Sequence, residues 1–249
     1  MKFEGSYVAL VTPFDREGRL DEDGYRHLIH RQLKSGTRGL VPCGSTGEAA
    51  TLLHEEYRRA IEIACDESRG EIAVIAGIGT NATWKAVESA REAESLGADA
   101  LLVLVPYYNK PTQEGIYQHF RAVAHESRLP IIAYNIPGRT GVNMAPKTLA
   151  RLAKDCPTIC AVKEAAGSLD QVSEILTLVK PGFTVLSGDD SLTVPLSAAA
   201  HTAWVSFGAM FATTETTPLA PTDIIGTVRL SSPESTVKPG LTRVSISDT

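Results

Sequence analysis

The sequence predicts a (β/α)8 barrel, of the TIM-barrel class, with an atypical, truncated or irregular C-terminal end. Its 249 residues match the size of one barrel, which typically has roughly 250. Short apolar runs alternate with amphipathic segments, and successive runs begin roughly 25–33 residues apart, the spacing of a βα repeat. Seven or eight such units favour a closed barrel over an open, doubly wound sheet.

The predicted strands are short runs rich in Val, Ile and Leu, without alternation of polar residues. This pattern is typical of strands buried on both faces of a parallel sheet. They are Tyr7–Val11, Gly39–Cys43, Ile72–Ala76, Ala100–Val105, Ile131–Tyr134, Ile159–Lys163, Thr184–Leu186 and, less clearly, Ala203–Phe207.

Amphipathic segments between these runs predict helices. They are Asp21–Ser35, His54–Glu67, Ala82–Leu96, Glu114–Glu126, Pro146–Lys154 and Leu169–Val179. Gly70, Gly97 and Gly182 stand at or just past helix ends, where chain reversal favours glycine. Pro146 suits a first helical turn.

A dinucleotide-binding sheet is excluded, because Thr12–Asp15 follows the first strand in place of a GxGxxG turn. We expect the barrel to span residues 1–212. The segment 213–249 is rich in Thr, Ser and Pro and has no period, so we expect an irregular tail there. We therefore expect the eighth strand to lack its helix.

The composition predicts a soluble, cytoplasmic protein. Net charge is −5 and mean hydropathy is −0.03, with no basic footprint for nucleic acid and no apolar run long enough to span a membrane. Met1–Asp15 does not have the pattern of a signal peptide. The spacings of the four cysteines and six histidines match no metal-binding pattern, so we expect reduced cysteines and no protein-bound metal.

Barrel enzymes carry their active sites at the carboxyl ends of the strands, and Lys163 ends an otherwise apolar strand. Desolvation there would lower the pKa of the ammonium and free a nucleophilic amine. The alternative is a lysine that extends to solvent or pairs with Glu164. Tyr134 ends the preceding strand, where its phenol could exchange protons with that amine; otherwise it is a core tyrosine.

Two loops add candidates for binding a carboxylate. Gly44–Gly47 offers two hydroxyls and several backbone N–H groups in a tight turn, although it could be an ordinary βα turn. Arg139 stands in a glycine-rich loop at the same face and could grip a carboxylate with its guanidinium, or simply be solvated.

Six stretches, in this order, resemble the dihydrodipicolinate synthase family (4-hydroxy-tetrahydrodipicolinate synthase), a family of class I pyruvate-dependent aldolases and lyases. The resemblance covers roughly residues 3–190. The stretches are Ala9–Phe14, Gly44–Glu48, Pro106–Pro111 with Gln113–Gly115, Tyr134–Gly141, Val162–Glu164 and Leu186–Asp190.

The resemblance implies a lyase that condenses pyruvate with L-aspartate 4-semialdehyde, toward diaminopimelate and lysine. It implies that Lys163 forms an imine with pyruvate and that Tyr134 relays protons. Ser45 and Tyr108 would complete a hydroxyl relay, with Tyr108 reaching across from a partner subunit of a dimer or tetramer. The remaining implied contacts are Thr46 on the pyruvate carboxylate, Arg139 on the semialdehyde carboxylate and the Val205 carbonyl facing pyruvate. No metal or organic cofactor is needed, because the protonated imine is itself the electron sink.

Three departures from the family pattern qualify these expectations. Ser45 stands where the synthases usually have Thr, and it lacks the methyl group that restricts the rotamer. Lys85 stands where lysine-sensitive members typically have an acid that binds the effector's ammonium, so we expect weak or absent lysine feedback. Beyond residue 212 the sequence has no likeness to the family. We interpret this segment as a frame-shifted reading or as the decayed end of a gene.

Alternatives therefore stay open. One is another pyruvate-dependent aldolase of the family, such as an N-acetylneuraminate or keto-deoxy sugar-acid lyase, which usually has Ser at the position of Ser45. Another is a non-catalytic, truncated remnant. A generic phosphate-sugar barrel enzyme is disfavoured, because phosphate usually binds after strands seven and eight, where this chain is least regular.

Overall fold

The computed structural model describes residues 3–195 and 205–206. Eight strands form one sheet in which every neighbouring pair is parallel and the spatial order follows the chain, from β1 to β8. The strands are β1 Tyr7–Ala9, β2 Gly39–Val41, β3 Ala73–Ile78, β4 Ala100–Leu104, β5 Ile131–Asn135, β6 Ile159–Glu164, β7 Thr184–Ser187 and β8 Val205–Ser206.

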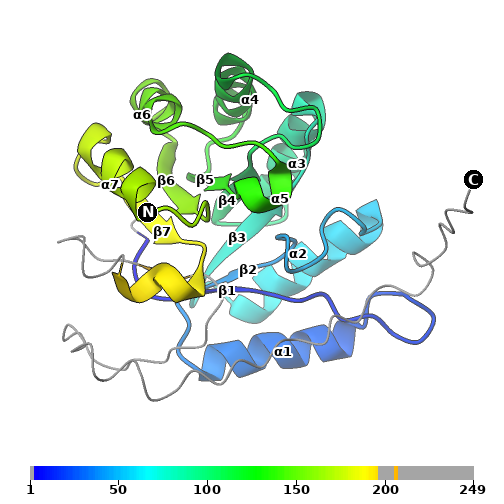
Figure 1. Ribbon diagram of the computed structural model, residues 1–249. Coiled ribbons are helices and arrows are strands. Elements are labelled where there is room, and N and C mark those ends of the chain that lie inside the picture. Colours follow the sequence, from blue (N-terminus) through cyan, green and yellow to red (C-terminus); the bar gives the residue numbers. More distant parts are fainter. Residues whose placement is uncertain (1–2, 196–204, 207–249) are drawn as a thin grey trace, which may run out of the picture.

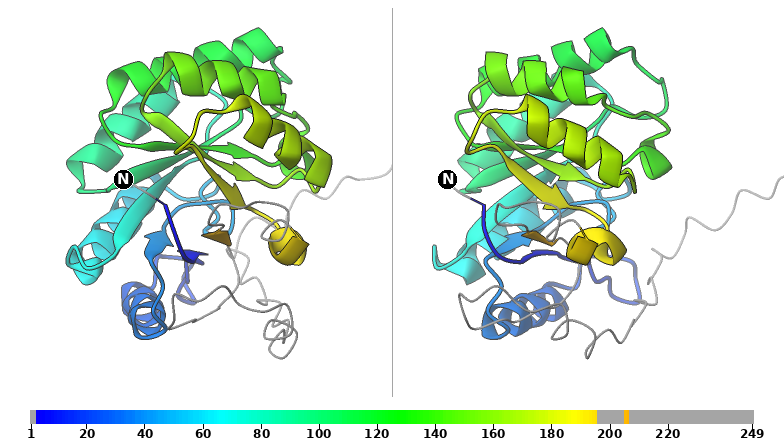
Figure 2. Two further views of the ribbon diagram at one scale, coloured as in Figure 1. Left: turned by 90° about the vertical axis from the view of Figure 1, so that its left-hand side faces the viewer. Right: turned by 60° about the vertical axis from the view of Figure 1, so that its left-hand side comes forward.

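The sheet curves, and its helices lie along the outer, convex side (Figure 1). The helices are α1 Glu22–Lys34, α2 His54–Ser68, α3 Thr83–Ser95, α4 Gln113–Glu126, α5 Pro137–Thr140, α6 Pro146–Asp155 and α7 Leu169–Leu178, with a 3-10 helix at Asp190–Leu192. Figure 2 shows the same curved sheet and helix layer from two further sides. The predicted (β/α)8 barrel class is thus confirmed, although no pairing within the described part of the chain joins β8 to β1.

The local sequence signals act where they were expected. Gly70, Gly97 and Gly182 have φ values of 74°, 93° and 92°, in the left-handed region that favours glycine. Pro146 opens α6. Helix α1 begins after Asp21, whose carboxylate accepts the Gly24 N–H at 2.9 Å and so satisfies one backbone donor of the first turn.

Two short elements were missed. Helix α5 and the 3-10 helix contain four and three residues, too few to produce a helical period in the sequence. The prediction that residues 213–249 form an irregular tail falls outside the described residues, as does the end of the predicted barrel domain at residue 212. Within residues 3–195 and 205–206, no helix has the length and apolarity needed to cross a membrane.

Side chains on the strands alternate between two apolar layers. The larger layer lies between sheet and helices and includes Val103, Ala133 and Val162. The inner layer fills the concave side and consists of Phe3, Tyr7, Val41, Ile75, Ala100, Leu102, Ile132, Tyr134, Ala161 and Leu186. Lys163 follows Ala161 by two positions, so the period of the strand directs it to the inner side together with Tyr134.

Candidate active site

Lys163 and Tyr134 face each other across neighbouring strands. They are register partners of β6 and β5, and the Lys163 Nζ lies 4.4 Å from the centre of the Tyr134 ring. Lys163 is only 7% exposed. This burial lowers its pKa from 10.5 to about 8; the negative charge of Asp190 opposes the shift, and the positive charge of Arg139 adds to it.

The lowered pKa changes what Lys163 can do. With a pKa of about 8, about a tenth of the amine is neutral at pH 7, compared with less than about a thousandth for an ordinary lysine. Only the neutral amine has the lone pair that attacks a carbonyl carbon. The strand end therefore holds a nucleophile that is usable near neutral pH.

Tyr134 connects Lys163 to the loop that follows β2. Burial raises the pKa of its phenol, while a hydrogen bond with the Ser45 hydroxyl and the charge of Arg139 act in the opposite direction. A phenol that contacts both an amine and a hydroxyl can pass protons between them. The structure thus brings together Lys163, Tyr134 and Ser45, three of the residues that the sequence nominated.

The loop of Ser45 and Thr46 is a tight turn held from within. The Gly47 N–H donates to the Gly44 carbonyl at 3.1 Å, and the Thr12 hydroxyl donates to the Gly47 carbonyl at 2.7 Å. Ser45 and Thr46 are exposed. Within the described part of the chain their backbone N–H groups donate to no backbone carbonyl.

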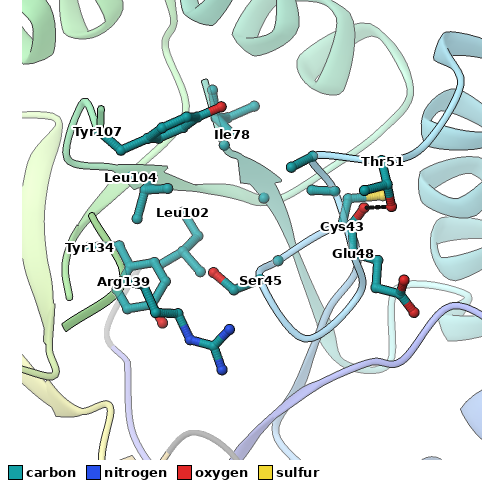
Figure 3. Close-up of a pocket in the computed structure, with 15 residues that line it drawn as sticks. Cys43, Ser45, Glu48, Thr51, Ile78, Leu102, Leu104, Tyr107, Tyr134 and Arg139 are labelled. Carbon is teal, nitrogen blue, oxygen red and sulfur yellow. Dashed lines mark hydrogen bonds between the residues drawn. The ribbon is translucent and has the colours of Figure 1, made fainter. Parts of the chain in front are cut away.

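A cavity of about 230 Å³ opens beside this loop. Figure 3 shows Ser45, Tyr134 and Arg139 around its polar end and Ile78, Leu102 and Leu104 along its apolar side. Arg139 stands on α5, exposed, and its guanidinium extends toward the polar end. Thr46 and Lys163 are not part of this wall; Lys163 lies deeper, against the Tyr134 ring.

Tyr108 is not brought to the other site residues within one chain. Its side chain is 84% exposed, and its φ of 68° is unusual for a residue with a Cβ. Its neighbour Tyr107 lines the cavity instead. The backbone carbonyl of Tyr107 accepts hydrogen bonds from the Asn109 N–H at 2.8 Å and the Asn81 side chain at 3.4 Å.

Val205 completes a row of register partners. Tyr134 pairs with Lys163, Lys163 with Leu186, and Leu186 with Val205. The backbone of Val205 therefore lies two strands from Lys163 at the same level of the sheet.

Neither Gly188 nor Asp190 was nominated from the sequence as a site residue, although both lie in Leu186–Asp190, one of the stretches that resemble the family. A Cβ on Gly188 would lie 3.2 Å from the Lys163 Cε and 2.6 Å from the Ala165 Cβ. The absence of a side chain at Gly188 therefore leaves room for Lys163. Within the described residues, no group of three or more His, Cys, Asp or Glu side chains could hold a metal ion.

Comparison with known proteins agrees with this geometry. The model of the Dihydrodipicolinate synthetase family matches residues 2–222. The 4-hydroxy-tetrahydrodipicolinate synthase of Nitratidesulfovibrio vulgaris (strain DSM 19637 / Miyazaki F) is 52% identical over 198 residues, which cover 80% of this chain and 68% of the relative.

Solved structures give the same result. The dihydrodipicolinate synthase from Aquifex aeolicus is similar with a TM-score of 0.79 and 47% identity, over 82% of this chain and 70% of the other. The chloride-inhibited enzyme from Acinetobacter baumannii, complexed with pyruvate, has a TM-score of 0.79 and 39% identity, over 83% of this chain and 70% of the other.

Proposed function

This chain belongs to the dihydrodipicolinate synthetase family, and we propose that it is a Schiff-base-forming lyase with 4-hydroxy-tetrahydrodipicolinate synthase activity. Its substrates are then pyruvate and L-aspartate 4-semialdehyde, and its product leads toward diaminopimelate and lysine. The observation that carries the proposal is the buried Lys163 amine with a pKa of about 8, in contact with the ring of Tyr134.

The chemistry follows from these two residues. The neutral amine of Lys163 attacks the C2 carbonyl carbon of pyruvate, and Tyr134 supplies the proton that the carbinolamine oxygen needs to leave as water. The protonated imine then withdraws electrons, so the pyruvate methyl group loses a proton and becomes an enamine carbon. That carbon forms a bond to the aldehyde carbon of the second substrate, whose oxygen takes up a proton and becomes a hydroxyl group. The amino group of the same substrate then attacks the imine carbon, which closes the ring of the product and releases the Lys163 amine.

Binding of the two carboxylates follows from the loops. The N–H groups of Ser45 and Thr46, which donate to no backbone carbonyl in the described part of the chain, suit the pyruvate carboxylate together with the Thr46 hydroxyl. Arg139, exposed on α5 at the mouth of the cavity, suits the carboxylate of the semialdehyde. The backbone carbonyl of Val205 faces pyruvate from the other side of Lys163.

We also propose that Tyr108 acts on the site of a second copy of the chain, in a dimer or tetramer. Its 84% exposure and left-handed backbone suit a side chain that is held outward for a neighbour. Activity per chain should then fall on dilution below the dissociation constant of the assembly, and Tyr108→Phe should lose about tenfold. Activity that is constant on dilution, with a monomer in sedimentation, would contradict a shared Tyr108.

Borohydride trapping with pyruvate, followed by peptide mass mapping, tests the central step. We expect a pyruvyl adduct on Lys163 and none on the exposed Lys147 of α6, which serves as the internal control. A folded protein that gives no adduct would overturn the proposal and favour a non-catalytic remnant. Pyruvate should also raise the melting temperature, because it binds only the folded state.

A second candidate, a keto-deoxy sugar-acid or N-acetylneuraminate lyase, is favoured by Ser45 alone. Such a lyase forms the same imine with pyruvate, so the two candidate activities are distinguished by the acceptor aldehyde that each uses. Untreated enzyme supplied with pyruvate should turn over with L-aspartate 4-semialdehyde and not with N-acetylmannosamine or glyceraldehyde; the opposite preference would replace the proposed substrate.

A further inference from the structure

A group of polar side chains with a buried centre lies behind the strand ends that carry Tyr134 and Lys163, and the proposed reaction does not use it. This amide–carboxylate cluster consists of Glu164 on β6, Asn135 on β5, Gln171 on α7 and Asn143 in the loop before α6. Glu164 is 3% exposed and Asn135 is fully buried. A carboxylate in such a place costs free energy unless hydrogen bonds replace its lost water.

The cluster meets this need completely. Each carboxylate oxygen of Glu164 lies 3.0 Å from the Asn135 Nδ2. One oxygen also accepts the Ala166 N–H at 2.8 Å, and the other accepts the Gln171 Nε2 at 3.0 Å. Burial raises the pKa of Glu164, and the donors from Asn135, Gln171 and the backbone counteract that rise.

The cluster joins four separate pieces of the fold. Besides its bonds to Glu164, Asn135 accepts the Met144 N–H through its side-chain oxygen at 3.0 Å. The Asn143 side chain exchanges hydrogen bonds with Gln171 at 2.8 and 3.2 Å. Two strand ends, the loop before α6 and the first turn of α7 are therefore tied to one carboxylate.

The position of the cluster in the sheet is what connects it to the site. Asn135 and Glu164 are register partners, next to the partners Tyr134 and Lys163. Side chains alternate across a sheet, so the cluster faces the helices and the reacting pair faces the concave side of the sheet. Asn135 and Glu164 are also the last residues of their strands, where strand ends otherwise open most easily.

We propose that Glu164 is a positioning residue. Together with Asn135 and Gln171 it locks the ends of β5 and β6, so that the Lys163 amine and the Tyr134 phenol stay buried and at reacting distance. The inference rests on the proposed function for the reaction that it serves. A displacement of about 1 Å in a reacting pair can cost about 10²-fold in rate.

The test compares Glu164→Gln with a matched control, Asp99→Asn. Glu164→Gln keeps the shape of the side chain but replaces one carboxylate oxygen with an amide NH2 group. This group then faces N–H donors whose hydrogen bonds the carboxylate had accepted. The Asp99 carboxylate also holds the backbone of a neighbouring strand, accepting the Val74 N–H at 2.8 Å, but at the start of β3 and β4, the end of the sheet opposite the site.

Two measurements are made on the full chain. The first is the rate of acetylation of Lys163 by acetic anhydride against pH, without substrate, read by peptide mass. The second is the rate of borohydride-trappable imine formation against pyruvate concentration. The acetylation rate measures the accessibility and basicity of the Lys163 amine, and it does not depend on which substrate the enzyme uses.

For Glu164→Gln we expect the rate of imine formation at saturating pyruvate to fall about tenfold. The pyruvate concentration that gives half of the maximal rate should change by less than about twofold. The midpoint of Lys163 acetylation should move from about 8 toward the ordinary value of 10.5, because loosened strand ends admit water. Asp99→Asn should leave both unchanged. A Glu164→Gln protein that only melts at a lower temperature, with both readouts as in the parent, would overturn the inference.

If Glu164→Gln does not fold, Gln171→Ala replaces it. Gln171 is half-buried and its loss removes one bond to Glu164, so we expect a two- to threefold fall in the same direction. Parental behaviour of a folded Gln171→Ala would count against the role of Glu164. Absence of any pyruvate adduct on the parent protein would instead reject the proposed function. The pH profiles of Lys163 acetylation in the parent and the variant would still show whether Glu164 positions Lys163.

Discussion

The two halves of the candidate site are built differently. Lys163 and Tyr134, on β6 and β5, are 7% and 5% exposed and stand in regular, register-paired strands. The loops after β2 and β4 hold Ser45, Thr46 and Tyr108, which are all exposed. Four residues of these two loops have positive φ although they carry side chains: Cys43, Glu48, Tyr108 and Lys110.

This difference separates two tasks. The strand half is complete within one chain, because burial is the largest cause of the lowered pKa of Lys163 and the strands supply that burial. The loop half holds strained backbone that costs of order 1–3 kcal/mol per residue and presents groups to solvent. Such exposed groups are accessible to a substrate or to a second chain. Changes in the strand half should therefore alter the chemical step most, and changes in the loops should alter it less.

The largest effect should follow Lys163→Met, which keeps the length of the side chain without the amine. Activity and pyruvate trapping should fall by at least about 10³-fold. Because folding buries this ammonium, the variant should be more stable than the parent at pH 7, by up to about 3 kcal/mol. Lys147→Met, on the exposed face of α6, should change neither property; a destabilised Lys163→Met would contradict the cost of burying the charge.

The same linkage gives a pH dependence in the parent protein. The folded pKa of Lys163 is about 8, below its unfolded value, so the unfolded state binds more protons between about pH 8 and 10.5. The contribution of Lys163 to stability should therefore improve as pH rises through this window. Imine formation should rise with pH and level off above about 8, as a trapping-rate profile would show.

Tyr134→Phe should have the next largest effect, about 10²-fold in turnover with little change in half-saturation by pyruvate. The ring still covers the Lys163 amine, so the loss isolates the hydroxyl that bonds to Ser45. Tyr117→Phe is the control, because its hydroxyl donates to Asp155 at 2.9 Å on the outer helices. Equal activity of the two variants would mean that Tyr134 only packs.

Gly188→Ala should come third. The added methyl group would crowd Lys163, Glu164 and Ala165, so we expect a loss of about 1–3 kcal/mol in the free energy of unfolding and a clear fall in trapping rate. Gly138→Ala, whose new Cβ would meet nothing within 4 Å, should leave thermal stability unchanged. Full trapping by Gly188→Ala would show that the strand end is not tightly packed around Lys163.

The smallest effect should follow Ser45→Thr in the exposed loop. The hydroxyl stays and the added methyl group restricts its rotamer, so turnover should rise modestly, up to about threefold, while Ser45→Ala should lose about tenfold. Steady-state kinetics at saturating pyruvate would measure both. An effect of Ser45→Ala as large as that of Tyr134→Phe would remove the distinction between the two halves.

Lysine feedback remains a prediction. The exposed Lys85, which stands where lysine-sensitive members typically have an acid, lies in the first turn of α3. A positive charge there would repel a cationic effector.

The sequence by itself determined the alternation of strands and helices, because buried parallel strands leave continuous apolar runs and caps leave glycines and prolines. It also singled out Lys163, since a lysine inside an apolar strand is chemically conspicuous. The short α5 was missed because four residues carry no period, and Gly188 and Glu164 were not nominated because their importance depends on which side chains lie beside them.

Only the tertiary structure decided how these residues meet. Register placed Tyr134, Lys163, Leu186 and Val205 in one row, and burial by the surrounding strands lowered the pKa of Lys163. The tertiary structure also separated Glu164, which is bound to amides behind the sheet, from Lys163, which lies on the opposite face of the sheet. A sequence records which groups a strand carries, whereas distances between strands and the exclusion of water arise only when the sheet closes around them.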